Sequence, residues 1–209
     1  QCEGGVNTAP QGFSYLEEIR QICNQHNWLM MLDEVQTGNG RTGQYFAYQH
    51  TNIVPDVLTT AKGLGNGFPI GAVMTQGRGV GVLTAGNHGS TYSGTALGSR
   101  VVYTVIDLIQ KENLVENARV VGEYLLDGLK NLEQQFPDKI TAARGRGLMC
   151  AINLPDGAAR DRMREILYED GLIILACGDQ SIRFRPHLNV TKEEIQIALD
   201  KIAASIEKI

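Results

Sequence analysis

The sequence predicts an α/β protein organised around a mostly parallel β-sheet. Two short apolar runs, residues 28–32 and 57–61, are each bounded by turn-forming residues, which is typical of buried strands in a parallel sheet. A helix is predicted for residues 14–26, just before the first run, because apolar residues recur there at helical spacing. Alternation of helices and strands fits the right-handed crossover connections of such sheets.

Each apolar run ends on a polar group. Asp33 and Glu34 follow the first run, and Lys62 follows the second, with a glycine-rich segment after it. In open α/β sheets, ligands bind outside the carboxyl ends of the strands. The sequence therefore predicts an acid and an amine at the edge where such a sheet holds small molecules.

An acid and an amine in these places have three interpretations. They could form a buried ion pair, or the lysine could simply face solvent. A P-loop nucleotide hydrolase requires a G-x-x-x-x-G-K-[ST] loop, and no stretch matches it, since Gly63 follows Lys62. In pyridoxal phosphate (PLP) chemistry, a lysine amine forms a Schiff base with the aldehyde and an acid partners the pyridinium nitrogen.

Two motifs carry a resemblance to a known family. DEVQTGNGRTG at residues 33–43 and PDVLTTAKGLGNGFPIGA at residues 55–72 resemble class III (ω-) aminotransferases, and the resemblance runs over essentially the whole chain. Within that family the first half is most similar to acetylornithine and ornithine aminotransferases. From Glu112 onward, ARGRGLMCAINLP and IRFRPHL also resemble lysine 6-aminotransferase.

The resemblance implies a fold and a domain organisation. Class III aminotransferases have the fold-type I architecture of PLP-dependent transferases. Residues 1–110 would be the C-terminal part of the large PLP-binding domain, including the start of the connecting helix, and residues 111–209 the small C-terminal α/β domain. The chain begins inside the family's E-P-I-Q-G-E-G-G motif, at Gln1. We therefore expect only the C-terminal half, without the glycine-rich phosphate cradle and the aromatic residue that stacks on the cofactor.

The resemblance also implies roles around the cofactor. Lys62 would be the covalent attachment point and would move a proton between substrate and cofactor carbons. Asp33 would pair with the pyridinium nitrogen, because a carboxylate is rarely buried without a partner. Val35 would pack on one face of the ring and Gln36 would hydrogen-bond the ring hydroxyl, although Gln36 could also be a turn residue. Glu34 is interpreted as structural.

The chemistry of Lys62 requires an unprotonated amine. An ammonium group cannot attack an aldehyde, so the lysine needs a pKa lowered by desolvation or by a nearby cation. Gly63, Gly65 and Gly67 are a weak match to a dinucleotide-binding loop, because no helix is predicted after them and Pro69 interrupts the pattern. We expect these glycines to let the backbone turn tightly beside the cofactor.

Ser90 and Thr91 are candidate phosphate ligands, since hydroxyls and backbone amides bind phosphate well. The family resemblance implies that they reach the cofactor of the neighbouring subunit, with Thr91 the stronger candidate, so the functional unit would be a homodimer. The alternative is a capped turn before a helix. The next residues, 92–96, read Tyr-Ser-Gly-Thr-Ala, whereas the family usually has Tyr-Gly-Gly-Asn-Pro.

Glu3 and Arg183 are the candidate substrate residues. The resemblance implies that Glu3 masks Arg183 while a diamine-type donor is bound, and releases it to grip the carboxylate of the keto acid. The alternatives are a solvated loop acid and a half-buried structural arginine. Strand alternation places Arg185 on the same face as Arg183, but it has no assigned role. Arg41 is expected to be a surface residue.

The implied reaction transfers a terminal amino group from a donor to 2-oxoglutarate, giving an aldehyde and glutamate. N-Acetylornithine or ornithine is the favoured donor, followed by lysine and 4-aminobutyrate, and the same scaffold also supports a mutase. A hypothesis of another class is an inactive folded fragment, or assembly piece, that lacks the N-terminal half of the site.

Composition excludes several other functions. The chain has 209 residues and a net charge of −4, which argues against a nucleic-acid surface. It has no apolar run long enough to span a membrane and no secretory signal pattern at its start. Its four cysteines lack C-x-x-C spacing, so we expect reduced thiols in the cytoplasm and no metal site.

The remaining elements follow from hydrophobic periodicity and from breakers such as Pro137. Residues 144 and 146, both arginines, are expected at the surface or in a loop. The predicted elements are strands at 70–75, 172–175 and 181–184, a strand pair within 140–154, and helices at 95–111, 114–136 and 158–170, with a last helix capped by Thr191.

Overall fold

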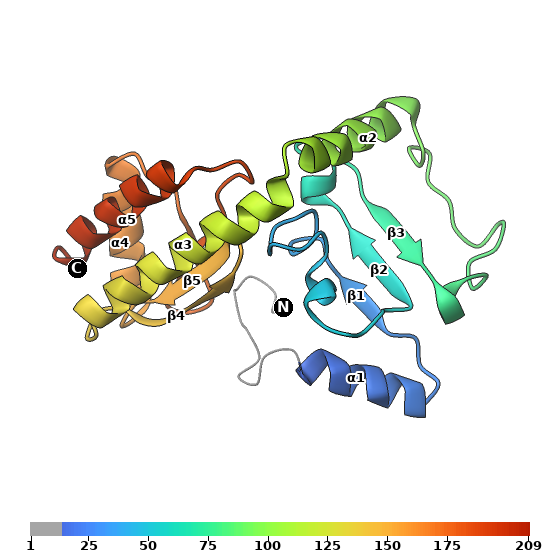
Figure 1. The fold of residues 1–209 in the computed structure, drawn as a ribbon, viewed down its shortest axis with the longest axis horizontal. Helices are drawn as coiled ribbons and strands as arrows, with labels where there is room; N and C mark the ends of the chain where they lie inside the picture. The colour runs from blue at the N-terminus through green and yellow to red at the C-terminus, as the bar shows by residue number, and fades with distance from the viewer. Residues whose placement is uncertain (1–13) are drawn as a thin grey trace. The chain divides into compact units, whose positions relative to one another are not determined.

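A computed structural model describes residues 14–209, so Glu3 lies outside the described residues. The chain divides into two compact units. Within the described residues, the N-terminal unit comprises residues 14–40 and 44–114, and the C-terminal unit comprises Arg41–Gly43 and Val115–Ile209. Figure 1 shows the elements of both units along the chain.

The N-terminal unit is built on a three-stranded sheet with the order β1-β2-β3. Strands β1 and β2 are parallel, and β3 pairs with β2 in the antiparallel direction. The first strand is shorter than residues 28–32, because the Trp28 N–H donates to the carbonyl of Cys23 in the preceding helix. The elements of this unit are α1 (Ser14–Gln25), β1 (Met31–Asp33), β2 (Val57–Thr60), β3 (Ala72–Thr75) and α2 (Ala96–Lys111).

Asp56, a buried residue just before β2, ties the N-terminal unit together. Its carboxylate accepts hydrogen bonds from Arg20 on α1 at 2.7 Å, from the Met30 N–H at 2.8 Å, and from Arg78 at 3.2 Å. Burial alone would raise the pKa of this carboxyl, but the hydrogen bonds from Arg20, Met30 and Arg78 lower it to about 2. One acid thus connects α1, the residue before β1 and the 3-10 helix η3 (Gly77–Gly79).

Glu34, the residue after β1, has a structural role, in agreement with the interpretation of this residue from the sequence. Its side chain is buried and accepts hydrogen bonds from the Thr37 hydroxyl at 2.6 Å, the Ala47 N–H at 2.9 Å and the Tyr48 N–H at 2.8 Å. Three donors make burial of a carboxylate tolerable. Glu34 therefore fixes the loop after β1, whereas the neighbouring Asp33 is exposed.

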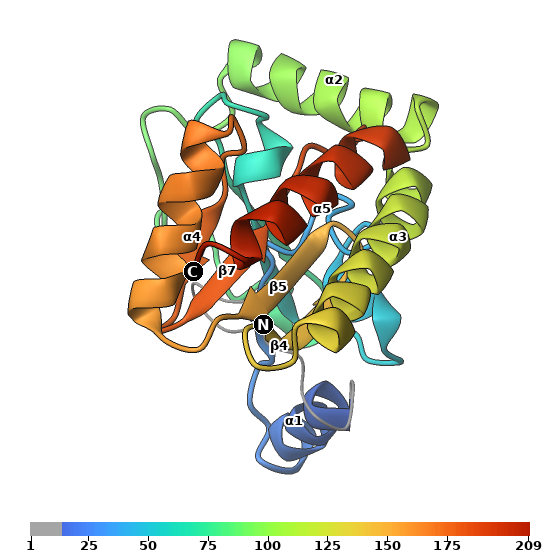
Figure 2. The ribbon, with the colours of Figure 1, turned by 90° about the vertical axis from the view of Figure 1, so that its left-hand side faces the viewer.

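The C-terminal unit is a four-stranded sheet with the order β4-β5-β7-β6. All its strand pairs are antiparallel. Helices α3, α4 and α5 cover one face of this sheet (Figure 2), and the main core, which includes Leu129, Ile152 and Ile202, lies there. The elements are α3 (Leu114–Gln135), β4 (Thr141–Arg146), β5 (Met149–Asn153), α4 (Gly157–Glu169), β6 (Leu175–Cys177), β7 (Ser181–Phe184) and α5 (Lys192–Ile206).

Two glycines allow α3 to approach the turn between β4 and β5. A Cβ added at Gly122 would lie 2.2 Å from the carbonyl carbon of Gly147, so a side chain there would push the helix away. Gly147 itself has a φ of +55°, in the region that favours glycine. At the other end of the unit, Thr191 caps α5, as the sequence predicted, and it forms a capping box with Glu194.

One secondary-structure expectation was wrong, and a second was wrong in part. The strand predicted at 172–175 lies at Leu175–Cys177, because the Leu172 N–H donates to the carbonyl of Leu167 and closes the end of α4. Arg144 and Arg146 lie in β4, not in a loop. Arg146 is exposed, as expected, whereas Arg144 is half-buried and bonded to Asn153 at 3.0 Å.

Candidate functional site

The structure brings the ends of β1 and β2 to one edge of the N-terminal sheet. Asp33, the last residue of β1, pairs with Thr59 on the parallel strand β2, and Lys62 follows that strand by one intervening residue. Both Asp33 and Lys62 are exposed. Parallel strands end on the same side of a sheet, so an acid and an amine leave the sheet at the same edge, where α/β proteins bind ligands.

Lys62 has an unusual backbone conformation. Its φ is +47°, a region that costs a residue with a side chain roughly 1 kcal/mol or more. The conformation starts the 3-10 helix η2 (Lys62–Leu64), in which the Lys62 carbonyl accepts hydrogen bonds from the Gly65 and Asn66 N–H groups, each at 3.1 Å. A Cβ at Gly65 would lie only 2.1 Å from the Phe68 carbonyl oxygen, so this tight turn requires glycine.

Asn39 supports the residue before Lys62, and sequence reasoning missed it. Its buried side-chain amide donates to the Thr60 hydroxyl at 3.0 Å and to the Ala61 carbonyl at 3.3 Å. The loop after β1 is thereby bonded to the end of β2. The available signal was an asparagine between two glycines, a residue type that tolerates its φ of +58°.

The cofactor-binding candidates near β1 lie in its terminal turn. The Val35 N–H donates to the Asp33 carboxylate at 2.8 Å, which fixes the orientation of that side chain. Val35 and Gln36 are half-buried. Asp33 is exposed and Glu34 is the buried acid, so the expectation of a buried Asp33 was wrong. Neighbouring residues of a strand point to opposite faces, so burial of Glu34 places Asp33 on the other face.

Ser90 and Thr91 lie in an exposed turn before α2. The Ser93 N–H donates to the Ser90 carbonyl at 3.1 Å, and Tyr92 between them is 83% exposed. The turn belongs to the same unit as Lys62. Whether these hydroxyls bind phosphate stays a prediction.

Arg183 lies in β7 of the C-terminal unit, opposite Ala151 of β5 and Leu175 of β6. It is half-buried, and its Nε is buried with no hydrogen-bond partner among residues 14–209. Arg41, expected at the surface, is instead half-buried, and its guanidinium donates to the carbonyl of Pro186. The pKa of Arg41 is lowered to about 10, mainly because the guanidinium is buried and to a smaller extent because of the positive charge of Arg185.

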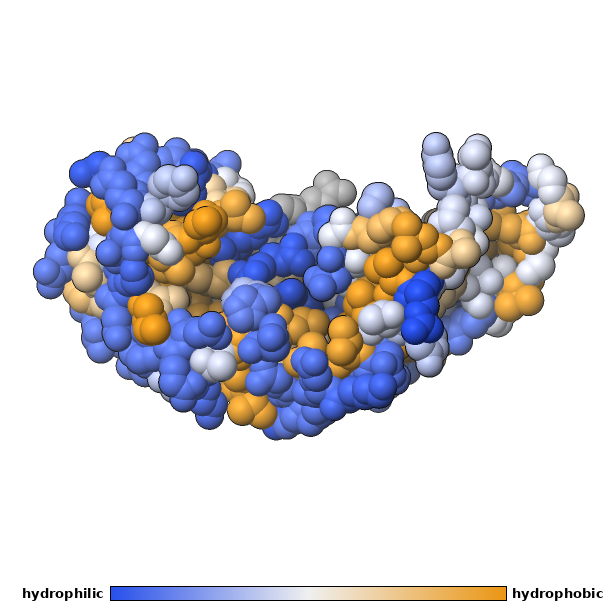
Figure 3. All heavy atoms as spheres, turned by 90° about the horizontal axis from the view of Figure 1, so that it is seen from above, coloured by the Kyte–Doolittle hydropathy of each residue, from blue (hydrophilic) through white to orange (hydrophobic). Residues whose placement is uncertain are grey.

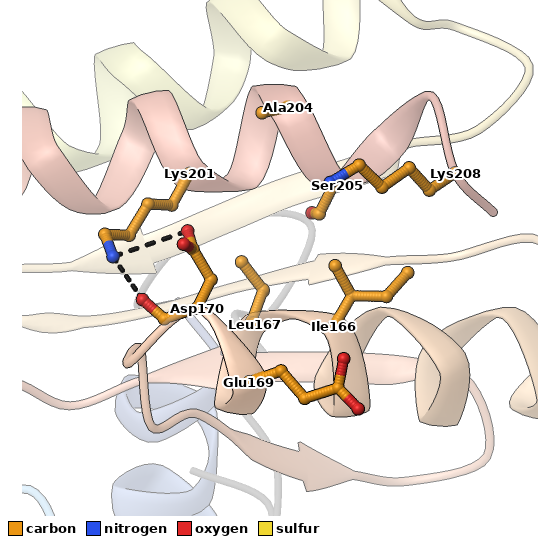
Figure 4. A pocket seen from close by; sticks show the side chains of 8 residues that line it. All are labelled: Ile166, Leu167, Glu169, Asp170, Lys201, Ala204, Ser205 and Lys208. Carbon is orange, nitrogen blue, oxygen red and sulfur yellow. Dashed lines mark hydrogen bonds and ion pairs between the residues drawn. The ribbon is translucent and has the colours of Figure 1, made fainter.

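A separate hollow of about 370 Å³ lies between α4 and α5 (Figure 4). Its charged groups are partly paired with each other, since the Lys201 Nζ lies 3.3 Å from the Asp170 carboxylate. None of the predicted site residues that the structure describes lines it. The lining residues are Ile166, Leu167, Glu169, Asp170, Lys201, Ala204, Ser205 and Lys208.

Residues 14–209 lack both a metal-binding cluster and a membrane-spanning helix. This part of the chain contains no group of three or more His, Cys, Asp or Glu side chains arranged to hold a metal ion. It also contains no helix with the length and apolar character needed to cross a membrane.

Comparison with known proteins gives the family. The model of the class-III aminotransferase family matches residues 1–206, and the chain belongs to this family, whose members are PLP-dependent. Acetylornithine aminotransferase of Nitrosomonas europaea is 39% identical over 206 residues, which cover 99% of this chain and 51% of that protein.

Solved structures confirm the fold class. Ornithine aminotransferase from Plasmodium yoelii has a TM-score of 0.88 and 34% identity, and the match covers 100% of this chain and 55% of that one. Lysine aminotransferase from M. tuberculosis has a TM-score of 0.86 and 32% identity over 93% of this chain and 45% of that one. The fold is that of fold-type I PLP-dependent aminotransferases. The chain spans about half the length of the relatives it matches.

Proposed function

We propose that the chain carries the catalytic lysine of a PLP-dependent aminotransferase that moves a terminal amino group from an ω-amino donor to a 2-oxo acid. The observation that carries this proposal is the parallel pairing of β1 with β2. Because of this pairing, Asp33 and Lys62 lie at the same edge of the sheet. The donor set fits PLP, since a carboxylate suits the ring nitrogen and an amine suits the aldehyde. When bound, PLP supplies an electron sink for the substrate carbon.

In the proposed mechanism, Lys62 Nζ would hold the cofactor and would serve as the base that moves a proton at the substrate carbon. Asp33 would hold the protonated ring nitrogen through its carboxylate. Its side chain is held ready by the Val35 N–H. Val35 would pack on the ring and Gln36 would bond its hydroxyl. Asn39, through the Ala61 carbonyl, would position the turn from which Lys62 projects.

The proposed donor is N-acetylornithine or ornithine, and the proposed acceptor is 2-oxoglutarate. Arg183 would bind a carboxylate of the acceptor, and Glu3 would mask that arginine while the donor is bound. Similarity alone does not choose the donor, because acetylornithine, ornithine and lysine aminotransferases resemble this chain at 39%, 34% and 32% identity. Lysine and 4-aminobutyrate are therefore the alternative donors.

Glutamate formation tests this proposal. The chain, loaded with PLP, is assayed with 2-oxoglutarate and each of acetylornithine, ornithine, lysine and 4-aminobutyrate. Lys62→Ala should abolish turnover with every donor. Lys111→Ala is the matched control, because Lys111 is an exposed lysine of the same unit that forms an ion pair with Asp107 on its own helix. Equal turnover by Lys62→Ala and wild type would contradict the proposal.

We also propose a homodimer in the cytoplasm. The exposed turn with Ser90 and Thr91 would reach the phosphate of the cofactor bound by the neighbouring subunit. The free thiols of Cys23, Cys150 and Cys177 suit a reducing compartment. Sedimentation of the active species as a monomer would contradict the dimer.

A second candidate function is that of a folded fragment, or assembly piece, that is inactive without the N-terminal half of the site. One observation that favours it is that the chain covers only 51% and 55% of the length of two of its relatives. Another is that apolar residues of β3 and of the following loop, including Val73 and Val82, are exposed. Titration with PLP separates the two candidates. Covalent attachment and turnover by this chain support the enzyme, whereas a folded chain that neither binds nor turns over supports the second.

A further inference from the structure

The chain contains two Asn-Gly dipeptides, Asn39-Gly40 and Asn66-Gly67, and the structure places them in opposite surroundings. Both asparagines have a positive φ, +58° at Asn39 and +44° at Asn66, and so do the glycines that follow them. Asparagine and glycine tolerate this backbone conformation better than other residues do. The two dipeptides therefore match in sequence and in the sign of φ, and they differ in what surrounds them.

Asn39-Gly40 is held by partners on both sides. Both residues are buried, and the Asn39 side-chain nitrogen donates to the Thr60 hydroxyl and to the Ala61 carbonyl. The Gly40 N–H donates to the Tyr45 carbonyl at 3.1 Å. The side-chain amide and the next backbone N–H are thus both engaged.

Asn66-Gly67 lies open in the turn that follows Lys62. Both residues are exposed, and a Cβ added at Gly67 would meet no atom within 4 Å. The Phe68 N–H donates to the Gly65 carbonyl at 3.0 Å across the pair, and positive φ at both central residues is what a type I′ turn requires. Among residues 14–209, neither the Asn66 side chain nor the Gly67 N–H has a hydrogen-bond partner.

An asparagine followed by glycine can react with its own backbone. Asparagine is among the thermolabile residues, and a following glycine has no side chain to obstruct the approach. The backbone nitrogen of the glycine forms a bond to the side-chain Cγ, and the amide group leaves as ammonia with the proton of that nitrogen. Water then opens the cyclic imide at either carbonyl and gives aspartate or isoaspartate. The net change is the uptake of water and the loss of ammonia, so the reaction needs no oxidant, reductant or cofactor.

We propose that Asn66 is a site of spontaneous deamidation, and that this modification impairs the attachment of PLP at Lys62. The Lys62 carbonyl accepts hydrogen bonds from the Gly65 and Asn66 N–H groups, so Asn66 belongs to the turn from which the lysine projects. Isoaspartate routes the main chain through its Cβ and Cγ and lengthens this turn by one atom, and either product adds a negative charge. The modification site rests on the contacts above, whereas the consequence for PLP rests on the proposed function.

Peptide mapping tests the modification site. The folded chain is incubated at mildly alkaline pH and digested with trypsin, which separates the two dipeptides into residues 21–41 and 63–78, and the products are analysed by mass spectrometry. We expect Asn66 to convert at least about tenfold faster than Asn39, because the two hydrogen bonds of the Asn39 amide must break first. In urea the two asparagines should convert at similar rates, because unfolding removes the protection. No conversion of Asn66, equal rates in the folded chain, or a difference that persists in urea would overturn the inference.

PLP attachment, measured on the same samples by borohydride reduction, tests the consequence. Attachment should fall in proportion to the conversion of Asn66. It should persist through the same incubation in Asn66→Gly, which keeps the positive φ and has no side-chain amide to lose. Circular dichroism establishes that each sample is folded. Full attachment in converted chains, or an equal decline in Asn66→Gly, would refute the consequence. Failure of PLP to attach to the freshly prepared chain would refute the proposed function and leave the deamidation site, which is read from the peptides alone, intact.

Discussion

The two units of the chain bury their apolar side chains to very different extents. The C-terminal unit packs three helices on one sheet face around residues with no exposure at all, such as Leu129 and Ile182. The N-terminal unit has a small apolar cluster of Cys23, Met30 and Ile53. Many of its other apolar side chains lie at the surface. Orange patches are visible on the face seen from above in Figure 3, and the exposed residues of this unit include Met31, Val73, Val80, Leu83, Leu97 and Leu108.

The difference indicates what holds each unit together. Apolar burial dominates the C-terminal unit. In the N-terminal unit, buried polar residues with several partners, Glu34, Asn39 and Asp56, connect the segments around the strand ends. Such networks rigidify a site but stabilise less than a full core does. The unit that carries Asp33 and Lys62 is therefore expected to be the less stable of the two.

The largest expected effect is the loss of core packing in the C-terminal unit. Leu129→Ala removes a fully buried side chain of α3 and should cost about 2–5 kcal/mol of unfolding free energy, because it leaves a cavity. Urea unfolding followed by circular dichroism measures it. Val82→Ala, at a side chain that is 57% exposed, should change stability by less than about 0.5 kcal/mol. Equal effects of the two substitutions would refute the contrast between the units.

The next effect is an acid sensitivity of the N-terminal unit. The Asp56 carboxyl has its pKa lowered from 3.8 to about 2, so its charged form stabilises the fold above pH 4. That contribution, about 2 kcal/mol, should be lost as the pH falls from roughly 4 to 2, because protonation weakens the bonds from Arg20 and Arg78. Asp56→Asn should lower stability at neutral pH and flatten this part of the pH profile. A wild-type profile already flat between these pH values would contradict the assignment.

The smallest effect concerns the position of Lys62. Asn39→Gly keeps the left-handed backbone conformation but removes the amide that bonds the Ala61 carbonyl. We expect a loss of roughly 1 kcal/mol in stability and several-fold slower attachment of PLP, with substrate KM changed less than kcat. Asn39→Asp tests the donor itself, because it preserves shape but cannot donate. Unchanged attachment rates in both variants would show that Asn39 does not position the lysine.

Sequence reasoning predicted the features that depend on local pattern. The helices, the approximate positions of the strands along the chain and the Thr191 cap of α5 follow from periodicity and capping residues, and the family follows from the motifs around Asp33 and Lys62. Features that depend on distant partners were missed. The partners of Asp56 come from positions 20, 30 and 78, and the Arg41 bond to Pro186 joins residues 145 positions apart. Spacing in the sequence does not reveal such contacts.

The roles of individual site residues stay predictions. The domain limits, residues 1–110 and 111–209, do so as well. Exposure of Asp33 could not be predicted, because burial of either of two adjacent acids satisfies the same pattern, and only the donors around Glu34 decide which acid is inside.

The attachment site of PLP tests the account most directly. The chain is incubated with PLP, treated with borohydride, digested and analysed by mass spectrometry. Our account predicts that the cofactor mass lies on the peptide containing Lys62 and disappears in Lys62→Ala, with Lys111→Ala unchanged. A label on another lysine, or no stable label on the folded chain, would contradict it.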